Sequence, residues 1–157
     1  MVIVAVASAA RVLSCASRLP YPVAVHFDAS GAPNGWMPPP VFVAFHLALL
    51  AVTSAVFLGA PRMLRRLPDR LINLPRRDYW LAPERREATI ARLGERLAGL
   101  GAAVIAFLAF GEELVLRANL YAGGHLASRA LAAGVALFLG YIGVWVVGLW
   151  RAFRAPT

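Results

Sequence analysis

The 157-residue chain has no lysine, a single cysteine and only eight acidic residues, and each scarcity excludes a class of protein. One cysteine cannot form an internal disulfide or a cysteine-rich metal site. Charged residues make up 15% of the chain and hydrophobic residues 60%, which is not the composition of an ordinary soluble domain. All sixteen basic residues are arginines, confined largely to a few short segments. We expect this pattern to reflect membrane topology, and we expect no nucleic-acid partner.

Four apolar stretches separate the charged segments, at residues 1–18, 41–60, 97–116 and 130–150. About 20 helical residues cross the hydrocarbon core of a bilayer, and the last three stretches have that length. The first stretch is short and contains Arg11, so either it begins upstream of Met1 or Arg11 extends to the interface. The pattern predicts an all-α fold, a four-transmembrane-helix bundle that forms one domain over residues 1–157 and has the lipid bilayer as its surroundings.

The first stretch has two alternative interpretations, a cleaved signal peptide and a lipoprotein processing site at Val12–Cys15. Both require a basic segment before the apolar one, which is missing, and an apolar segment free of charge, which Arg11 contradicts. We therefore expect Cys15 to be a buried, unreactive thiol.

The arginines predict the orientation. Ten of the sixteen lie between Arg62 and Arg96 and two lie in the C-terminal tail, whereas the other two loops hold only three. Because positive charge favours the cytoplasmic side, both termini and the basic 62–96 segment should be cytoplasmic, in a bacterial cytoplasmic membrane. Within that segment, Pro83 should begin a helix that continues directly into the third span.

Residues 19–36 interrupt the apolar pattern with turn and strand chemistry. Two prolines at the start exclude a helix, Val23–Phe27 alternates like a short strand, and residues 30–35 are rich in turn residues. We predict a short, structured, hairpin-like loop on the extracytoplasmic side. Its aromatic side chains should pack onto helix ends, and one of its glycines should adopt φ > 0. The residues concerned are Phe27, Trp36, Gly31 and Gly35.

Two patterns along the chain resemble those of a known family. The first comprises Leu19-Pro20, Val23, His26-Phe27-Asp28, Gly31, Pro33 and Gly35-Trp36. The second comprises Ile72–Pro75 and Asp78–Arg86. In this order they resemble a bacterial membrane family of unknown function, domain of unknown function 1648, which also forms the N-terminal half of SdpI-type toxin-immunity proteins. The resemblance implies a multi-pass membrane protein with an immunity or signalling role.

Ionisable residues inside the predicted spans mark a functional hypothesis, since each is costly there. They are His46, Glu112 and Glu113. Counted along their helices, all three lie at a similar depth near the extracytoplasmic side. Glu113 shares a helical stripe with several small residues that pack against neighbouring helices, so we predict that Glu113 faces inward and pairs with His46. The alternative to a functional pair is a hydrogen bond that only fixes the register of the helices.

Three further polar residues, His26, Asp28 and His125, should lie at the same end. With His46 and Glu113 they form a predicted ligand-binding or structural polar cluster. A Zn²⁺ site is the alternative. The spacing matches no metal motif, so we predict no metal and no cofactor, and expect His26 and Asp28 to satisfy backbone groups of the next turn. No catalytic motif is present, and we expect no enzymatic activity.

On the cytoplasmic side, the second pattern predicts a surface for a protein partner or for anionic lipid. Its residues are Asn73, Asp78, Tyr79, Trp80, Arg85 and Arg86. Overall, the sequence favours a non-enzymatic membrane protein that senses or binds a ligand, an extracytoplasmic peptide or a membrane or cytoplasmic partner. The alternatives are a small transporter or ion-handling protein that uses His46 and Glu113, and an accessory subunit of a larger membrane complex.

Overall fold

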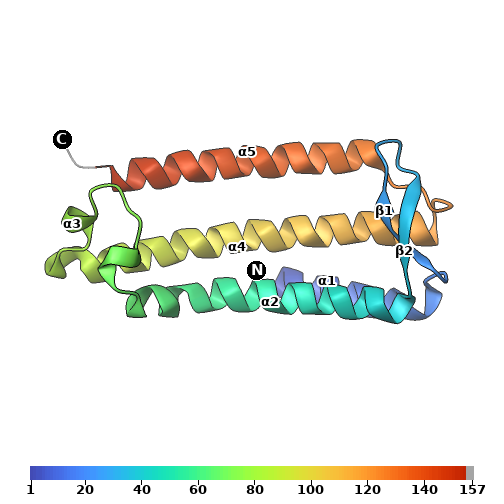
Figure 1. Cartoon of the computed structure of the whole chain (residues 1–157), viewed down its shortest axis with the longest axis horizontal. Coiled ribbons are helices and arrows are strands. Elements are labelled where there is room, and N and C mark those ends of the chain that lie inside the picture. Colours follow the sequence, from blue (N-terminus) through green and yellow to red (C-terminus); the bar gives the residue numbers. More distant parts are fainter. Residues whose placement is uncertain (155–157) are drawn as a thin grey trace.

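The computed structural model describes residues 1–154, which form a bundle of long helices with a short cap at each end (Figure 1). In chain order the elements are α1 (Val2–Cys15), η1 (Ala16–Arg18), β1 (Val23–Phe27), β2 (Pro33–Met37), α2 (Pro39–Arg66), η2 (Asp69–Leu71), α3 (Arg77–Trp80), α4 (Pro83–Leu120) and α5 (Ser128–Phe153). The β1–β2 hairpin and the α4–α5 turn lie at one end, here called the hairpin end. The α2–α4 connection and the last described residues lie at the other, here called the arginine-rich end.

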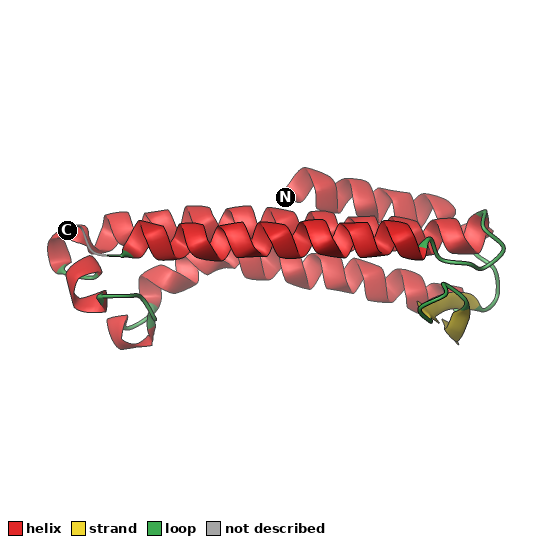
Figure 2. Ribbon diagram, turned by 90° about the horizontal axis from the view of Figure 1, so that it is seen from above, coloured by secondary structure: helices red, strands yellow, loops and turns green. Residues whose placement is uncertain are grey.

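Three helices, α2, α4 and α5, are long and apolar enough to cross a membrane. The predicted first span corresponds to α1, which has 14 residues. At 1.5 Å per residue that is about 21 Å, less than the hydrocarbon core. Helix α1 lies beside α2 and α4 in the half of the bundle next to the hairpin (Figures 1 and 2). The helical bundle is therefore observed, and the four-span count is not confirmed.

Helix α4 is the centre of the bundle because it packs against α1, α2 and α5. It begins at Pro83, where a proline is favoured, and continues without a break for 38 residues into the apolar segment, as predicted. Gly101 lets α2 approach closely, since a Cβ there would lie 2.5 Å from Phe57. Helix α5 packs chiefly against α4, and Phe153 is the one buried residue of its described length.

Two hydrophobic clusters form the core, one near each end of the bundle. The cluster at the hairpin end contains Val12, Cys15, Val23, Phe42 and Leu116, and the cluster at the arginine-rich end contains Ile72, Leu74, Leu81, Ile90, Leu93 and Phe153. Cys15 is only 1% exposed, which confirms the prediction of a buried thiol. Each cluster joins one cap to the long helices, so the caps are part of the folded bundle.

The predicted short strand, Val23–Phe27, is β1, and it pairs with β2 in an antiparallel hairpin. Val23 lies opposite Met37 and Ala24 opposite Trp36, and the register shifts after Ala24. The chain leaves the hairpin through Pro38, and α2 begins at Pro39. A short structured loop thus stands across one end of the bundle, as the sequence predicts.

Candidate functional site at the hairpin end

One side chain of α4 hydrogen-bonds the backbone of the hairpin. The Asn119 side-chain amide accepts a hydrogen bond from the Ala24 N–H at 2.9 Å and donates one to the Ala24 carbonyl at 2.9 Å. The amide therefore takes the place of a neighbouring strand at the inner edge of β1. Because Ala24 is only 3% exposed, these two backbone groups would otherwise be buried without partners.

The tip of the hairpin is closed by Asp28. Its Oδ1 accepts hydrogen bonds from the Ser30 N–H at 2.8 Å, the Ser30 hydroxyl at 2.6 Å and the Ala32 N–H at 3.1 Å. Donors of this kind stabilise the charged carboxylate, so the bond from the Ser30 side chain, followed by that from Ala32, lowers the pKa of Asp28. Of the two residues predicted to satisfy backbone groups of the turn, Asp28 does so, whereas His26 makes no such hydrogen bond among the described residues.

The hairpin also contacts the α4–α5 turn at Gly31. The Leu126 N–H donates a hydrogen bond of 2.9 Å to the Gly31 carbonyl. Gly31 has φ +88°, as predicted for one of the two loop glycines, and a Cβ there would collide with the Leu126 carbonyl. Gly35 does not have positive φ. Its Cα hydrogens face His26, whose Cβ would lie 2.9 Å from an added methyl group.

Several side chains of the hairpin end remain exposed. His26 and His125 are exposed, and Tyr21 is 80% exposed. The prediction that Trp36 packs onto a helix end is wrong, because the residue is 53% exposed. Alternate residues of β2 point outward, and Trp36 is one of these. The backbone of this end is thus fixed while much of its aromatic and imidazole surface stays accessible.

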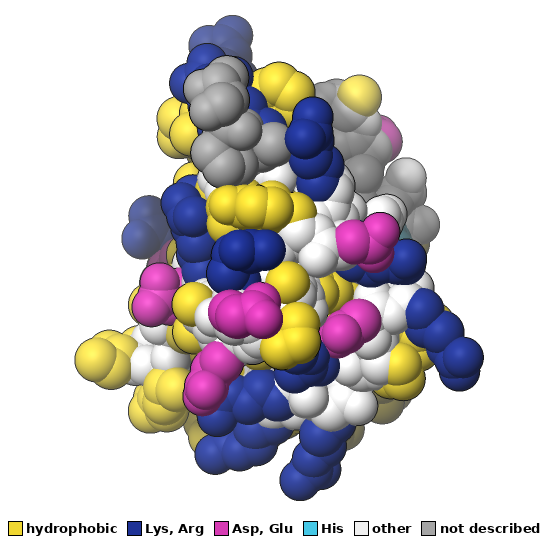
Figure 3. Space-filling model, turned by 90° about the vertical axis from the view of Figure 1, so that its left-hand side faces the viewer, with side chains coloured by type: hydrophobic (Ala, Val, Ile, Leu, Met, Phe, Trp, Pro, Cys, Tyr) yellow, Lys and Arg dark blue, Asp and Glu magenta, His cyan; other side chains and the backbone are white. Residues whose placement is uncertain are grey.

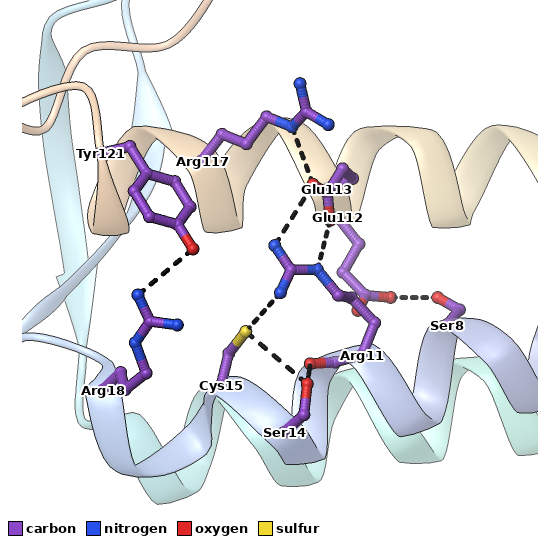
Figure 4. Close-up of polar contacts among 9 residues, drawn as sticks. All are labelled: Ser8, Arg11, Ser14, Cys15, Arg18, Glu112, Glu113, Arg117 and Tyr121. Carbon is purple, nitrogen blue, oxygen red and sulfur yellow. Dashed lines mark hydrogen bonds and ion pairs between the residues drawn. The ribbon is translucent and has the colours of Figure 1, made fainter.

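Behind the hairpin, α1 and α4 are joined by polar side chains (Figure 4). The Ser8 hydroxyl donates to Glu112 Oε2 at 2.5 Å, and Arg11 Nε donates to Glu113 Oε2 at 2.9 Å. Arg117 Nε donates to Glu113 Oε1 at 2.7 Å, one helical turn along α4. Arg11 also donates to the Cys15 sulfur at 2.8 Å. Two adjacent carboxylates therefore contact successive turns of α1.

The predicted pair of His46 and Glu113 is wrong. Within residues 1–154, no hydrogen bond or ion pair joins them, because Glu113 is taken by Arg11 and Arg117. His46 Nδ1 instead lies 3.2 Å from the Phe42 carbonyl of its own helix. The inward carboxylate is Glu112, which is 3% exposed and whose Oε1 has no partner in the described part of the chain.

The predicted polar cluster is therefore divided among separate places. Asp28 is used in the turn, Glu113 in the ion pairs and His46 within α2, while His26 and His125 are exposed. Among the described residues, no group of three or more His, Cys, Asp or Glu side chains is arranged to hold a metal ion. The geometry thus gives no support to the zinc alternative.

Sequence reasoning missed three residues that fix this end: Ser8, Arg11 and Asn119. The signals were present. Ser8 and Arg11 are three residues apart, on one face of α1, and a charge in an apolar helix requires a partner. Asn119 lies two helical turns after Glu112, on the same face of α4. Reading the two faces together would have predicted contact between them.

At the arginine-rich end, residues of the second pattern, Ile72–Pro75 and Asp78–Arg86, are used mainly within the fold. Trp80 Nε1 donates to the Phe153 carbonyl at 2.6 Å, and the two rings lie edge to face at 5.5 Å. Arg86 bridges Asp69 at 2.8 Å and the Leu67 carbonyl at 3.1 Å. These contacts fasten the α2–α4 connection to α4 and α5, so Trp80 and Arg86 have structural roles.

The other predicted residues of that surface are more accessible. Arg85 stacks over the Tyr79 ring at 4.0 Å and donates to its carbonyl at 2.7 Å. The Asp78 side chain is 96% exposed, and Asn73 is exposed beside a 170 Å³ apolar cavity. Figure 3 shows arginine and acidic side chains interspersed on this end of the molecule. Asn73, Asp78, Tyr79 and Arg85 remain available to a partner or to lipid headgroups.

Comparisons with curated proteins and with solved structures found no match. A comparison with protein-family models found one match, which covers residues 3–52. That segment contains α1, the hairpin and the first half of α2, and so includes the first of the two patterns described above. Residues 3–52 match the family described as a domain of unknown function, DUF1648, which confirms the resemblance inferred from the sequence.

Proposed function

We propose that this chain is a non-enzymatic protein of the bacterial cytoplasmic membrane that binds a peptide or protein partner at its hairpin end. In this proposal the hairpin end is extracytoplasmic, α1 belongs to the membrane-embedded bundle, and both termini are cytoplasmic. The role is of the sensing, immunity or signalling type suggested by the resemblance to SdpI-type proteins.

The observation that carries the proposal is the contrast between a fixed backbone and an accessible surface at one place. Asn119 and Leu126 hold the hairpin from two sides, while Tyr21, His26 and Trp36 are exposed. A surface that is ordered before binding loses less entropy on association, and aromatic side chains are frequent anchors of interfaces. An unstructured linker between two helices would need neither of these hydrogen-bonded contacts.

The orientation is tested by reporter fusions. Fusions at Ala29 and Gly124 should report an extracytoplasmic position and a fusion at Asp78 a cytoplasmic one. The arginine distribution is the reason, with twelve of sixteen arginines at the arginine-rich end. A cytoplasmic signal at Ala29 would overturn both the orientation and the proposed place of binding.

The binding role is tested in a deletion strain challenged with secreted peptide toxins. The deletion should sensitise the strain to at least one peptide, and the intact gene should restore resistance. Trp36→Ala should abolish that rescue at unchanged membrane abundance. The matched control is Val144→Ala, which is also exposed, at 74%, but lies on α5 away from the hairpin, and which should rescue fully. A deletion strain as resistant as its parent, or full rescue by Trp36→Ala, would contradict the proposal.

The two alternative functions, a transporter and an accessory subunit, differ in their support. The transporter hypothesis depended on His46 and Glu113 acting together, and each instead has partners of its own.

The hypothesis of an accessory subunit is favoured by α5. The part of this helix that is long and apolar enough to span a membrane has no buried residue, and the helix borders a 580 Å³ groove against α4. A cysteine series along α5, labelled from the lipid phase, should be protected in cells and reactive in the purified chain. Equal reactivity in both would exclude that role.

A further inference from the structure

Among the described residues, Glu112 of α4 is the only buried acidic residue, at 3% exposed. The next residue, Glu113, has 29% of its side chain exposed and forms ion pairs with Arg11 and Arg117. In Figure 4 the two carboxylates take different paths: Glu113 reaches the arginines, and Glu112 reaches the Ser8 hydroxyl of the facing helix. The two neighbours therefore differ in what compensates a negative charge.

No guanidinium group is hydrogen-bonded to Glu112 in the described part of the chain. Its Oε2 is bonded to an uncharged group, the Ser8 hydroxyl, and its Oε1 has no hydrogen-bond partner among those residues. Arg11, three residues from Ser8 on α1, directs its Nε to Glu113 and one Nη to the Cys15 sulfur. A carboxylate removed from water without a counter-ion is costly, and such a group takes up a proton instead.

The Ser8 hydroxyl suits Glu112 with or without a proton. A hydroxyl both donates and accepts hydrogen bonds, so it donates to a charged carboxylate and accepts from a neutral carboxylic acid. A lysine or arginine in its place would have favoured the charged form alone. Ser8 thus preserves the contact between α1 and α4 in both protonation states.

Glu112 lies where α1 docks on α4. The buried residues of α1 are Ser8, Val12 and Cys15, whose spacings of four and three place them on one face of the helix. Glu112 contacts this face at Ser8. A charge on Glu112 would therefore lie inside the contact between the two helices, next to the negative charge of Glu113, and would weaken that contact.

Other ionisable groups belong to the elements packed around this contact in the hairpin half of the bundle. Those of arginine keep their charge at every pH used below. His46 is half-buried and lies against the Phe42 carbonyl of its own helix. The groups are those of Arg11 and Cys15 on α1, Arg18 on η1, His26 on β1, His46 on α2, Glu113, Arg117 and Tyr121 on α4, and Arg129 on α5.

We propose that Glu112 is a proton-binding site between α1 and α4, and that the docking of α1 depends on its proton. In the docked state the side chain is a neutral carboxylic acid hydrogen-bonded to Ser8. When α1 moves away, water reaches the carboxyl group, which releases its proton as an ordinary glutamate does. The docked state therefore binds one more proton than the undocked state, so docking weakens as pH rises. This site goes beyond the proposed partner-binding function and does not depend on which side of the membrane the hairpin faces.

Infrared difference spectroscopy tests the presence of the proton. The full chain is measured at neutral pH in a maltoside detergent, which has no carbonyl group, and the spectrum of Glu112→Gln is subtracted. The difference should contain the C=O band of a protonated carboxyl group and no carboxylate band. The matched control is Glu113→Gln at the neighbouring, ion-paired residue, which should remove carboxylate bands instead. Loss of carboxylate bands in Glu112→Gln would overturn the proposal.

Labelling of Cys15 tests the link between the proton and docking, because Cys15 is the only cysteine of the chain and is 1% exposed while α1 is docked. Its rate of reaction with a maleimide is compared between the parent and Glu112→Gln at each pH, so that the titration of the thiol and of the other groups cancels. Between about pH 6 and about pH 8, the ratio of the parent rate to the variant rate should rise by up to about tenfold per pH unit, the slope for one proton. Glu113→Gln should speed labelling by a similar factor at every pH.

Two further outcomes would overturn the proposal. A ratio that stays constant with pH would show that docking of α1 does not depend on the proton of Glu112. Failure of Glu112→Gln to fold would also contradict the account, because glutamine has the shape of the neutral acid and can hydrogen-bond to the Ser8 hydroxyl.

Discussion

Each end of the bundle has a buried hydrophobic cluster, but the polar contacts that hold the two caps differ. At the arginine-rich end, three buried apolar residues of the connecting segment pack against three more from α4 and α5, and aromatic and arginine side chains fasten the segment. At the hairpin end, backbone groups are held one by one, by Asn119, by Asp28 and by the bond between Leu126 and Gly31. The first cap is thus fastened by long aromatic and arginine side chains, whereas the backbone of the second is held directly, as in a fixed binding loop.

The arginine-rich end and the hairpin end also differ in how they use arginine. The arginine-rich end holds twelve of the sixteen, and in the proposed orientation many of them would favour the cytoplasmic side or attract anionic lipid without a defined partner. The hairpin end holds few, and Arg11 and Arg117 are bound to one defined carboxylate. Single substitutions should therefore be tolerated at most arginines of the first end and should be felt at the second.

The largest expected effect is at Gly31. Gly31→Ala should destabilise the protein by about 3 kcal/mol, because a left-handed residue with a Cβ costs roughly 1–2 kcal/mol and overpacking typically adds 1–3 kcal/mol. The matched control is Gly123→Ala, which also has positive φ but has nothing within 4 Å of an added Cβ. Thermal unfolding in nanodiscs would measure both. Equal shifts would mean that the contact with Leu126 contributes nothing.

An effect of similar size tests the arginine-rich end. Trp80→Ala should cost about 3 kcal/mol, at the lower limit for removal of a large aromatic side chain, because Trp80 is only partly buried. Trp80→Phe keeps the ring and loses the bond to the Phe153 carbonyl, so about 1 kcal/mol is expected. The readout is thermal unfolding together with protease cleavage between α2 and α4. If Trp80→Ala melts like the parent and resists cleavage equally, the fastening role is refuted.

A somewhat smaller effect is expected at Asn119. Asn119→Leu leaves the buried N–H and carbonyl of Ala24 without partners, which should cost about 2 kcal/mol. Asn73→Ala, an exposed asparagine at the other end, should change stability by less than about 0.5 kcal/mol. Comparable destabilisation by the two substitutions would show that the two hydrogen bonds of Asn119 do not contribute to stability.

The smallest effect concerns pH. Because the folded-state pKa of Asp28 is lowered, its contribution to the turn is present above the ordinary aspartate value and is lost as pH falls through the folded value. Amide exchange at Ser30 and Ala32, corrected for its intrinsic pH dependence, should therefore show loss of protection below about pH 4, near the unperturbed pKa of aspartate. Asp28→Asn should remove that dependence. An unchanged acid transition in this variant would assign it to another group.

The sequence predicted much of the hairpin and of α4, because proline, glycine and turn residues act locally. The strand Val23–Phe27, a positive φ at Gly31 and the start of a long helix at Pro83 were all predicted from such signals. These signals do not depend on which elements lie nearby, and so they survive in the folded protein.

The rest was missed because it depends on how the helices rotate against one another, which no single segment shows. The choice of Glu113 over Glu112 as the inward carboxylate relied on a stripe of small residues in α4, whereas Ser8 and Arg11 of α1 decide which carboxylate is buried. The exposure of Trp36 likewise depends on which face of β2 turns toward the helices, which the sequence of the strand alone does not show. Both errors concern contacts between segments, not the segments themselves.

The central claim is that the hairpin is a fixed surface and not a linker, and amide hydrogen exchange of the full chain in nanodiscs tests it most directly. The Ala24 N–H, held by Asn119, and the Leu126 N–H, held by Gly31, should be strongly protected. Asn119→Leu should remove the protection at Ala24 while amides in the middle of α4 keep theirs. Exchange of the parent's Ala24 and Leu126 amides at the rate of an unstructured loop would contradict the account.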